Sequence, residues 1–293
     1  MNLIAAFGLL VLSSLAVFPA FAEDSAHNNV VVIGSADFPE SQLIATIYAK
    51  ALDAKGIKTE TKLSIGSREV YMPALRDGSI DLIPDYSGSV LTYLDKTARA
   101  QSSQEVTDAL KKALPAGISM LTPSPAQDAD TLVVTSATAS KYGLKSISDL
   151  KNVAGDLVMG ASPEWRGRWE GMVGLKEVYD VKFKSFRPLD VTGPLTLSAL
   201  LHGQIDVANL TTTNPALARN KLVSLEDPKN LIPAQNVVPI FATQKIDAKV
   251  SAILDAVSAA MTTEDLVEMN GRLANHDDIG AIAADWLATH KLN

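Results

Sequence analysis

One short frame occurs twice in the chain, first from residue 74 and again from residue 199. Residues 74–82 read Ala-Leu-Arg-Asp-Gly-Ser-Ile-Asp-Leu, and residues 199–207 read Ala-Leu-Leu-His-Gly-Gln-Ile-Asp-Val. In each copy a helix-like stretch ends at a glycine suited to the left-handed C-terminal position, and an apolar strand follows. Gly-x-Ile-Asp is also a common helix-to-strand turn, which is the simpler alternative. We expect the frame to reflect two similar α/β units.

Small polar residues follow both expected strands. The first strand, residues 80–83, stops at Pro84 and is followed by Asp-Tyr-Ser-Gly-Ser, which we interpret as a ligand-binding loop. The second is followed by Thr-Thr-Thr-Asn, which makes Thr212 and Asn214 candidate binding residues. Ligands of open α/β sheets bind outside the carboxyl ends of strands, so we expect the two strand ends to face each other across a cleft.

The rest of the chain alternates strands with helices, beginning with a strand at 30–33 and a helix at 41–55. This order predicts an α/β fold with mostly parallel sheets. The length of 293 residues suits two domains. Turn-forming residues at 123–130 and 227–236 mark two crossings between them. The predicted division is lobe 1 from residues 23–130 and 236–293 and lobe 2 from residues 131–235, with the crossings as a hinge.

The first 22 residues have the character of a cleavable signal peptide. They carry no charged side chain, run apolar from residue 3 to 18, and end in Ala-Phe-Ala. An uncleaved membrane anchor is the alternative, but the run is short for a span. The chain has no cysteine, so it can form neither a disulfide nor a lipid-anchoring thioether. We expect a soluble periplasmic protein that is not a lipoprotein.

Composition argues against several function classes. A net charge of -7 disfavours nucleic acid as a partner. With four histidines, no cysteine and no nucleophile motif, we expect neither catalysis nor a cofactor. The His-Asp-Asp run at 276–278 reads better as a helix cap than as a metal site. A secreted two-lobe enzyme remains the rival interpretation, whereas a regulator's effector domain would lack the signal sequence.

Residues 161–171 carry the strongest chemical signal, with arginines placed between tryptophans after an apolar strand. A guanidinium there can clamp a carboxylate, and an indole can cover a cationic group. The alternative is a surface arginine stacked on tryptophan. Asp128 and Asp130 lie near the first crossing, where they could cap turns, act as paired carboxylates or contact a cation.

Taken together, these segments resemble the osmoprotectant substrate-binding proteins of bacterial ABC importers, the glycine betaine, choline and carnitine group. The resemblance covers nearly all of the chain after the signal peptide. It implies a two-lobe periplasmic binding protein fold of type II with a two-segment hinge, closing over a small molecule and docking on an ABC permease. We expect a monomer. The matching segments are residues 33–35 with Glu40, 66–70, 78–82, 85–89, 161–171 and 284–287.

The resemblance assigns roles to three residues. Tyr86 matches a tyrosine of the aromatic box that holds a quaternary ammonium, Ser89 matches a hydroxyl position in the same loop, and Arg168 matches the arginine that binds the ligand carboxylate. A cation over aromatic faces and a bidentate arginine together suit a betaine.

Other box positions depart from the family pattern. Ala36 stands where relatives often have lysine, while Asp130, Leu210 and Gln235 stand where the box would have tyrosines. We therefore expect Asp85 and Asp130 to carry the ligand's positive end in place of a full cage. The predicted ligand is a quaternary ammonium or related zwitterionic osmoprotectant, and an amino-acid-like or other polar cation is the alternative.

Overall fold

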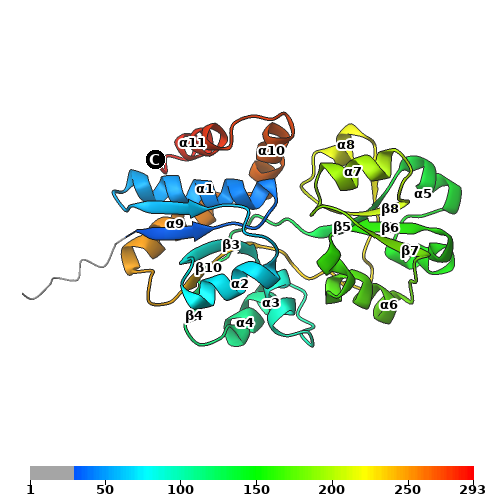
Figure 1. The fold of residues 1–293 in the computed structure, drawn as a ribbon, viewed down its shortest axis with the longest axis horizontal. Helices are drawn as coiled ribbons and strands as arrows, with labels where there is room; N and C mark the ends of the chain where they lie inside the picture. Colours follow the sequence, from blue (N-terminus) through cyan, green and yellow to red (C-terminus); the bar gives the residue numbers. More distant parts are fainter. Residues whose placement is uncertain (1–29) are drawn as a thin grey trace, which may run out of the picture.

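The computed structural model describes residues 30–293, so the predicted signal peptide lies outside the described residues. They form two lobes, each built around a five-stranded sheet (Figure 1). The sheet of lobe 1 has the order β2-β1-β3-β10-β4, and that of lobe 2 has the order β7-β6-β8-β5-β9. The strands of lobe 1 are β1 (Val31–Gly34), β2 (Thr59–Lys62), β3 (Leu82–Tyr86), β4 (Ile118–Met120) and β10 (Val237–Ala242). Those of lobe 2 are β5 (Asp130–Val134), β6 (Val158–Ala161), β7 (Ser185–Pro188), β8 (Val207–Thr211) and β9 (Val223–Ser224).

The two sheets repeat one pairing pattern. In lobe 1, β1 pairs in parallel with β2 and β3, and β10 pairs antiparallel with β3 and β4. In lobe 2, β6 pairs in parallel with β7 and β8, and β5 pairs antiparallel with β8 and β9. The α/β fold class is confirmed, and four of the five strands in each sheet run in the same direction, as expected of mostly parallel sheets, while β5 and β10 run the opposite way. Each of these is the first strand after a crossing, and it starts beside the carboxyl end of its neighbour, so it must run the opposite way.

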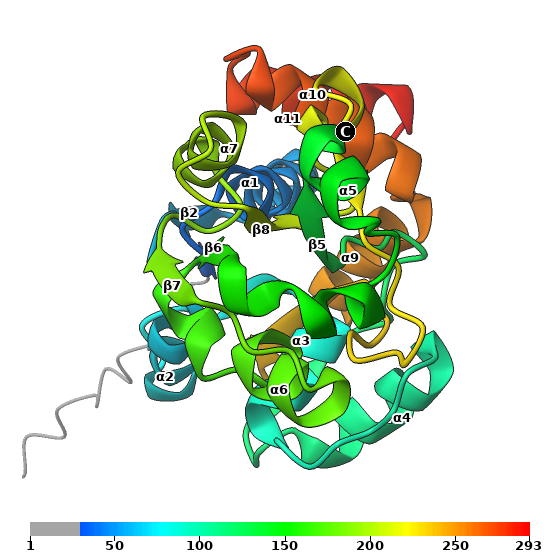
Figure 2. The same ribbon diagram turned by 90° about the vertical axis from the view of Figure 1, so that its right-hand side faces the viewer.

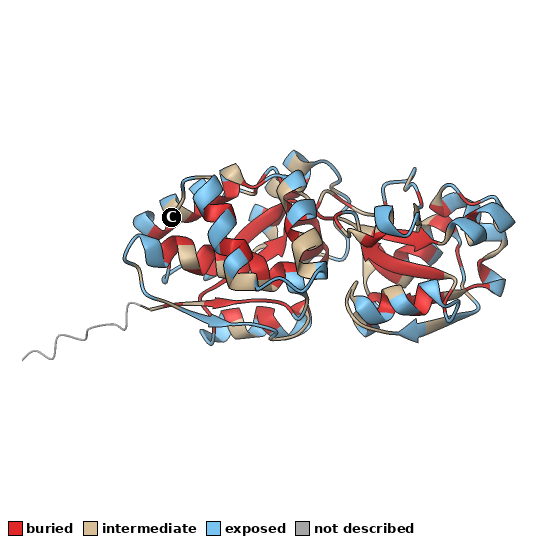
Figure 3. Ribbon diagram, turned by 90° about the horizontal axis from the view of Figure 1, so that it is seen from above, coloured by how far each residue is buried: buried red, intermediate tan, exposed pale blue. Residues whose placement is uncertain are grey.

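Helices cover both faces of each sheet (Figures 1, 2 and 3). Separate apolar clusters pack on the two faces of each sheet, and they contain most of the buried aliphatic side chains. The helices of lobe 1 are α1 (Pro39–Ala54), α2 (Arg68–Asp77), α3 (Ser87–Leu94), α4 (Ser103–Ala113), α9 (Ala248–Ala260), α10 (Thr263–Ala274) and α11 (Ile279–Thr289). Those of lobe 2 are α5 (Ser136–Tyr142), η1 (Ile147–Asn152), η2 (Ala154–Asp156), η3 (Pro163–Arg166), η4 (Trp169–Val173), α6 (Gly174–Tyr179), α7 (Pro194–Leu201) and α8 (Ala216–Arg219). Every helix within residues 30–293 is too short or too polar to cross a membrane.

The duplicated frame is the same structural device in both lobes. Its glycine has a φ of 81° in the first copy and 66° in the second, the left-handed conformation that glycine adopts without strain. The aspartate that follows ties the next strand to its neighbour through its side chain. Asp81 accepts a hydrogen bond from the backbone N–H of Val32 at 2.9 Å, and Asp206 accepts one from Val158 at 2.8 Å. The aspartate of each copy therefore hydrogen-bonds the start of β3 to β1 in lobe 1 and the start of β8 to β6 in lobe 2.

The two crossings, residues 121–129 and 225–236, run side by side. Gln127 and Asn236 form an antiparallel bridge, and the N–H of Asp128 donates to the carbonyl of Gln235 at 3.1 Å. Two adjacent extended segments joined in this way make a hinge between the lobes.

The loop expected after Pro84 is strand and helix instead. β3 continues through Pro84 to Tyr86, and α3 begins at once with Ser87. Pro84 lies opposite Pro239 of β10. Neither residue has an N–H group, so the two occupy a non-hydrogen-bonded pair of the ladder without leaving a broken bond. This pairing allows a proline in a central strand, where the sequence pattern alone suggests a strand end.

Candidate functional site

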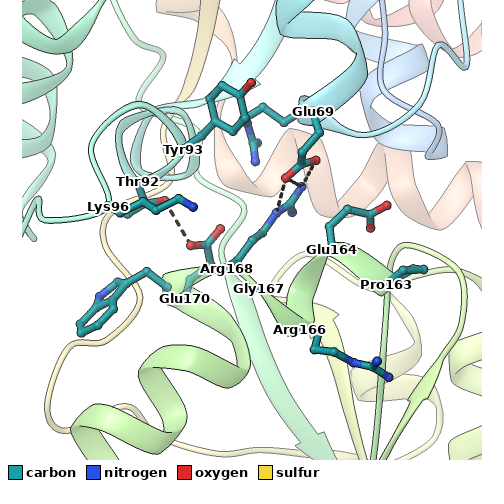
Figure 4. Close-up of a pocket in the computed structure, with 12 residues that line it drawn as sticks. Glu69, Thr92, Tyr93, Lys96, Pro163, Glu164, Arg166, Gly167, Arg168 and Glu170 are labelled. Atoms are coloured by element: carbon teal, nitrogen blue, oxygen red, sulfur yellow. Dashed lines mark hydrogen bonds and ion pairs between the residues drawn. The ribbon is translucent and has the colours of Figure 1, made fainter.

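A cleft of about 520 Å³ lies between the two lobes. Its lobe 1 wall comes from α2, α3 and Lys96, and its lobe 2 wall comes from the segment after β6 (Figure 4). The lining side chains are mostly charged or aromatic. They are Arg68, Glu69, Thr92, Tyr93, Lys96, Pro163, Glu164, Arg166, Arg168, Trp169 and Glu170, with the backbone of Gly167.

The lobe 2 wall is shaped by a sharp kink at Gly171. This residue has φ -103° and ψ -139°, which interrupts the helical path within η4. A Cβ atom there would lie 2.0 Å from the backbone oxygen of Trp165, so glycine is required by close approach. The kink turns the side chains of residues 168–170 toward lobe 1.

Each of these three side chains contacts lobe 1. Arg168 forms an ion pair with Glu69 of α2, with Nη2 3.1 Å from Oε2. The ring of Trp169 lies under the guanidinium of Arg99, whose Cζ is 3.9 Å from the ring centroid. Glu170 accepts a hydrogen bond from the hydroxyl of Thr92 on α3 at 3.1 Å. One short segment of lobe 2 thus provides much of the inter-lobe contact at the cleft.

Glu170 is an unusual group for a cleft wall because its side chain is buried, with 3% of the residue exposed. Burial raises the pKa of this carboxyl, and the nearby Asp130 carboxylate adds to the rise. A hydrogen bond to its own backbone N–H and the positive charges of Arg168 and Arg68 oppose the shift without cancelling it. A cation entering the cleft would favour the ionised form of Glu170.

Arg68 and Asp85 form a buried ion pair beneath the cleft, with Nη2 2.6 Å from Oδ1. Burial alone would lower the pKa of Arg68, but Asp85, Tyr71 and Glu170 raise it well above its ordinary value. Asp85 also accepts hydrogen bonds from the Tyr71 hydroxyl and the Tyr86 N–H, each at 2.7 Å. With the second bond from Arg68, four donors surround this carboxylate. Asp85 therefore fixes Arg68 and β3, and it has no oxygen left for the cation that the sequence analysis assigned to it.

A second polar cluster joins the lobes beside the hinge. Glu40, at the start of α1, accepts hydrogen bonds from Tyr86, from Asn270 of α10 and, at 3.1 Å, from the hydroxyl of Thr213 in lobe 2. The N–H of Thr213 also donates to Asp128 at 3.0 Å. Thr213 thus contacts two carboxyl groups of the lobe 1 side at once.

Glu40 and Asp128 are both buried, at 5% and 6% exposure. Burial raises the pKa of Glu40, and the hydrogen bonds from Tyr86, Asn270 and Thr213 only partly offset the rise. The pKa of Asp128 is raised well above its ordinary value by burial and then by the charge of Glu40. Two close carboxyl groups in one buried site favour a shared proton.

Of the eight residues predicted to bind a ligand, Arg168 lines this cleft in the described part of the chain. Tyr86 is buried, hydrogen-bonds Glu40, and stacks on Phe38 with centroids 6.2 Å apart. Ser89 and Gln235 meet beside the hinge, where the N–H of Ser89 donates to Oε1 of Gln235 at 3.0 Å.

The three other predicted residues lie along the edge of lobe 2 that faces the hinge. Asp130 accepts a hydrogen bond from the amide of Asn209 at 2.8 Å. Thr212 lies 3.3 Å from the Asp128 carboxylate. Asn214 caps a turn by accepting from the N–H of Ala216 at 3.0 Å. The strand ends therefore meet at one edge, but these side chains serve the local structure there.

Of the twelve described residues that line the cleft, Arg168 alone was among the predicted binding residues; the others include Glu69, Thr92, Lys96 and Glu170. Glu69 and Glu170 each stand in a segment that carries the family resemblance, Glu69 next to Arg68 and Glu170 two residues after Arg168. An acidic residue within two positions of an arginine in both segments was the available signal. Among residues 30–293, no group of three His, Asp or Glu side chains is arranged to hold a metal ion.

Comparison with known proteins extends along nearly the whole described chain. The family described as "Substrate binding domain of ABC-type glycine betaine transport system" matches residues 29–289. The glycine betaine-binding protein YehZ of Escherichia coli is 24% identical over 272 residues, covering 88% of this chain and 89% of that protein. The carnitine transport binding protein OpuCC of Listeria monocytogenes is 25% identical over 253 residues, covering 84% and 81%. The crystal structure of a glycine betaine/carnitine/choline ABC transporter protein matches the fold with a TM-score of 0.70 at 22% identity, covering 89% and 99% of the two chains.

Proposed function

Because the chain belongs to the family of substrate-binding domains of ABC-type glycine betaine transport systems, we propose that it captures a small zwitterion between its lobes and delivers it to an ABC permease. The ligand carries a cationic nitrogen and a carboxylate. The protein binds it without catalysis and without a cofactor, and it acts as a monomer in the periplasm after loss of residues 1–22.

The observation that carries this proposal is the position of Arg168 and Glu170 on one turn of the cleft wall. Arg168 presents a guanidinium to the cleft, and Glu170, two residues on, presents a buried carboxylate (Figure 4). The first suits a ligand carboxylate, and the second suits a positive nitrogen. A zwitterion can contact both groups at once, whereas an ion of one sign can contact only the group of opposite charge.

The names of the relatives supply candidate ligands, since one is a glycine betaine-binding protein and another a carnitine-binding protein. Quaternary ammonium zwitterions of this kind are the first candidates for the present chain. An amino-acid-like zwitterion is the second candidate, and the covered ring of Trp169 favours it.

Thermal unfolding of the purified protein with single compounds tests the proposal. The panel contains glycine betaine, carnitine, choline, an ectoine and amino acids, each at millimolar concentration. A ligand at about 100 times its Kd stabilises the folded state by about 2.7 kcal/mol, which raises the Tm by several degrees. We expect a zwitterion to raise the Tm and choline, which has no carboxylate, to have a smaller effect. If no zwitterion shifts the Tm, the proposed ligand class is wrong.

A further inference from the structure

The aromatic faces near the cleft are already occupied. The guanidinium of Arg99 covers the ring of Trp169. Tyr86 is buried against Phe38. Among the described aromatic residues that line the cleft, this leaves the ring of Tyr93 on the lobe 1 side. A quaternary ammonium gains its binding energy from several uncovered aromatic faces, and one ring does not form a cage.

The Glu170 carboxyl of the cleft wall, by contrast, is well placed to accept hydrogen bonds from a ligand. Glu170 is 3% exposed and lines the cleft, and besides the bond from its own backbone N–H it accepts one hydrogen bond, from the Thr92 hydroxyl at 3.1 Å. The two arginines near Glu170 form ion pairs with other partners, Arg68 with Asp85 and Arg168 with Glu69. A buried carboxylate has room for about four hydrogen bonds, and leaving acceptors unpaired after water is expelled is costly.

We infer, on the basis of the proposed function, that the cationic nitrogen of the ligand carries N–H groups and donates them to Glu170 while Arg168 holds the carboxylate. The ligand is then a primary or secondary ammonium zwitterion, such as an amino acid, or a guanidino acid. A trimethylammonium group cannot donate a hydrogen bond and would desolvate Glu170 without replacing its water. Sites built to hydrogen-bond a ligand group strongly reject analogues that lack it.

The two residues lie close together in the chain. Residues 168 and 170 are two peptide units apart, so their Cα atoms are at most about 7 Å apart. Both side chains are directed into the same cleft (Figure 4). A compact molecule with its nitrogen a few bonds from its carboxylate therefore reaches both groups.

Titration calorimetry with pairs of compounds that differ only in N-methylation tests this inference. Suitable pairs are glycine and glycine betaine, proline and its dimethyl betaine, and 4-amino-3-hydroxybutyrate and carnitine. In at least one pair we expect the amine to bind about tenfold or more tightly than its fully methylated partner, because a hydrogen bond to a charged group is lost. If the methylated member binds more tightly in every pair that binds, the inference is overturned and the proposed function stands. If no member of any pair binds, the proposed function fails with it.

Two isosteric variants assign the preference to a residue. Glu170→Gln should reduce the amine's advantage to about threefold or less, since the amide presents a weaker acceptor. Asp130→Asn is the matched control, because Asp130 lies near Glu170 but outside the cleft lining. It should weaken both members of a pair by a similar factor and keep the preference. If the preference for the amine survives Glu170→Gln, or is lost in Asp130→Asn alone, Glu170 is not the residue that causes it. If a variant fails to fold, the comparison of amine with betaine in the parent protein still tests the inference.

Discussion

Arg168 of lobe 2 and Glu69 of lobe 1 form an ion pair across the cleft, with Nη2 3.1 Å from Oε2. Their side chains are 20% and 42% exposed, so the pair is weak compared with a buried one. A ligand carboxylate that binds Arg168 must compete with Glu69 for the same guanidinium. The ion pair therefore occupies the Arg168 guanidinium and also links the two lobes.

Removing this competitor should strengthen binding. Glu69→Gln takes away the negative charge and keeps the shape of the side chain, so a carboxylate ligand should bind up to about fivefold more tightly, in line with about 0.2–1 kcal/mol for an exposed pair. Glu164→Gln is the control, since Glu164 lines the same cleft but Arg168 pairs with Glu69. Equal affinities of the Glu69→Gln variant and the parent, measured by calorimetry, would show that the pair does not compete with the ligand.

The kink at Gly171 should be intolerant of a side chain. In Gly171→Ala the new Cβ would lie 2.0 Å from the backbone oxygen of Trp165, so residues 165–171 must move and binding should fall at least about tenfold. Gly167→Ala is a matched control four residues earlier, where the nearest atom would be 3.8 Å away. We expect the control to bind as the parent does. Similar affinities for the two variants would argue that the shape of this wall does not matter.

The carboxyl pair beside the hinge predicts a pH dependence of stability. The pKa values of Glu40 and Asp128 are raised in the folded state, so the folded protein binds more protons than the unfolded chain above about pH 4. The free energy of unfolding should therefore fall as pH rises through the raised pKa values, and this contribution is fully present only below about pH 4. Urea unfolding at a series of pH values from 4 to 9 measures the slope.

The variant Asp128→Asn should flatten that slope. Its amide can donate to Glu40 as a protonated carboxyl does, and its carbonyl can still accept from the N–H of Thr213. We expect the variant to exceed the parent in stability at pH 8 and to lose less stability between pH 5 and pH 8. Glu60→Gln, an exposed substitution on β2, controls for the change in net charge. If the stability of the parent and of Asp128→Asn changes with pH in parallel, the Glu40–Asp128 pair is not the cause of the pH dependence.

The aspartate of the duplicated frame should contribute to stability in lobe 1. Asp81→Ala leaves the N–H of Val32 without its side-chain acceptor in a buried strand, which should cost about 1–3 kcal/mol in the free energy of unfolding. Asp81→Asn keeps an acceptor oxygen and should cost less. Urea denaturation of the two variants distinguishes a role of the Asp81 hydrogen bond from a role of its charge. Equal losses in the free energy of unfolding would indicate that the charge matters instead.

Much of the architecture could be predicted from the sequence because it depends on local signals. The frame at residues 78–81 and 203–206 indicates a left-handed glycine followed by a strand, and both copies have that structure. The direction of β5 and β10 could not be predicted in the same way, because it is set by where the chain enters each lobe. The extent of β3 was missed because Pro84 lies at a non-hydrogen-bonded position opposite β10, and that register is set by a strand far away in the sequence.

The binding site was predicted less completely than the fold, because the sequence does not show which charged side chains pair with one another in the folded protein. Arg168 was identified by the family resemblance, in a segment already marked by its arginines and tryptophans, and it does line the cleft. Asp85 was assigned to the ligand, but the fold gives it Arg68, Tyr71 and a backbone N–H as partners. A sequence shows which charges are present, while tertiary contacts decide which of them remain available to a ligand.

The most direct test of the account is the affinity of Arg168→Ala for whichever carboxylate-bearing ligand the thermal screen returns, measured by titration calorimetry against the parent protein. Arg166→Ala serves as the control, since Arg166 also lines the cleft but its guanidinium lies over the ring of Phe186 within lobe 2, 4.9 Å from the centroid. Loss of one partner of a desolvated charge pair typically costs about 2–5 kcal/mol, so Arg168→Ala should bind at least about thirtyfold more weakly, while the control changes little. If Arg168→Ala binds the ligand as tightly as the parent does, the zwitterion is not held in this cleft.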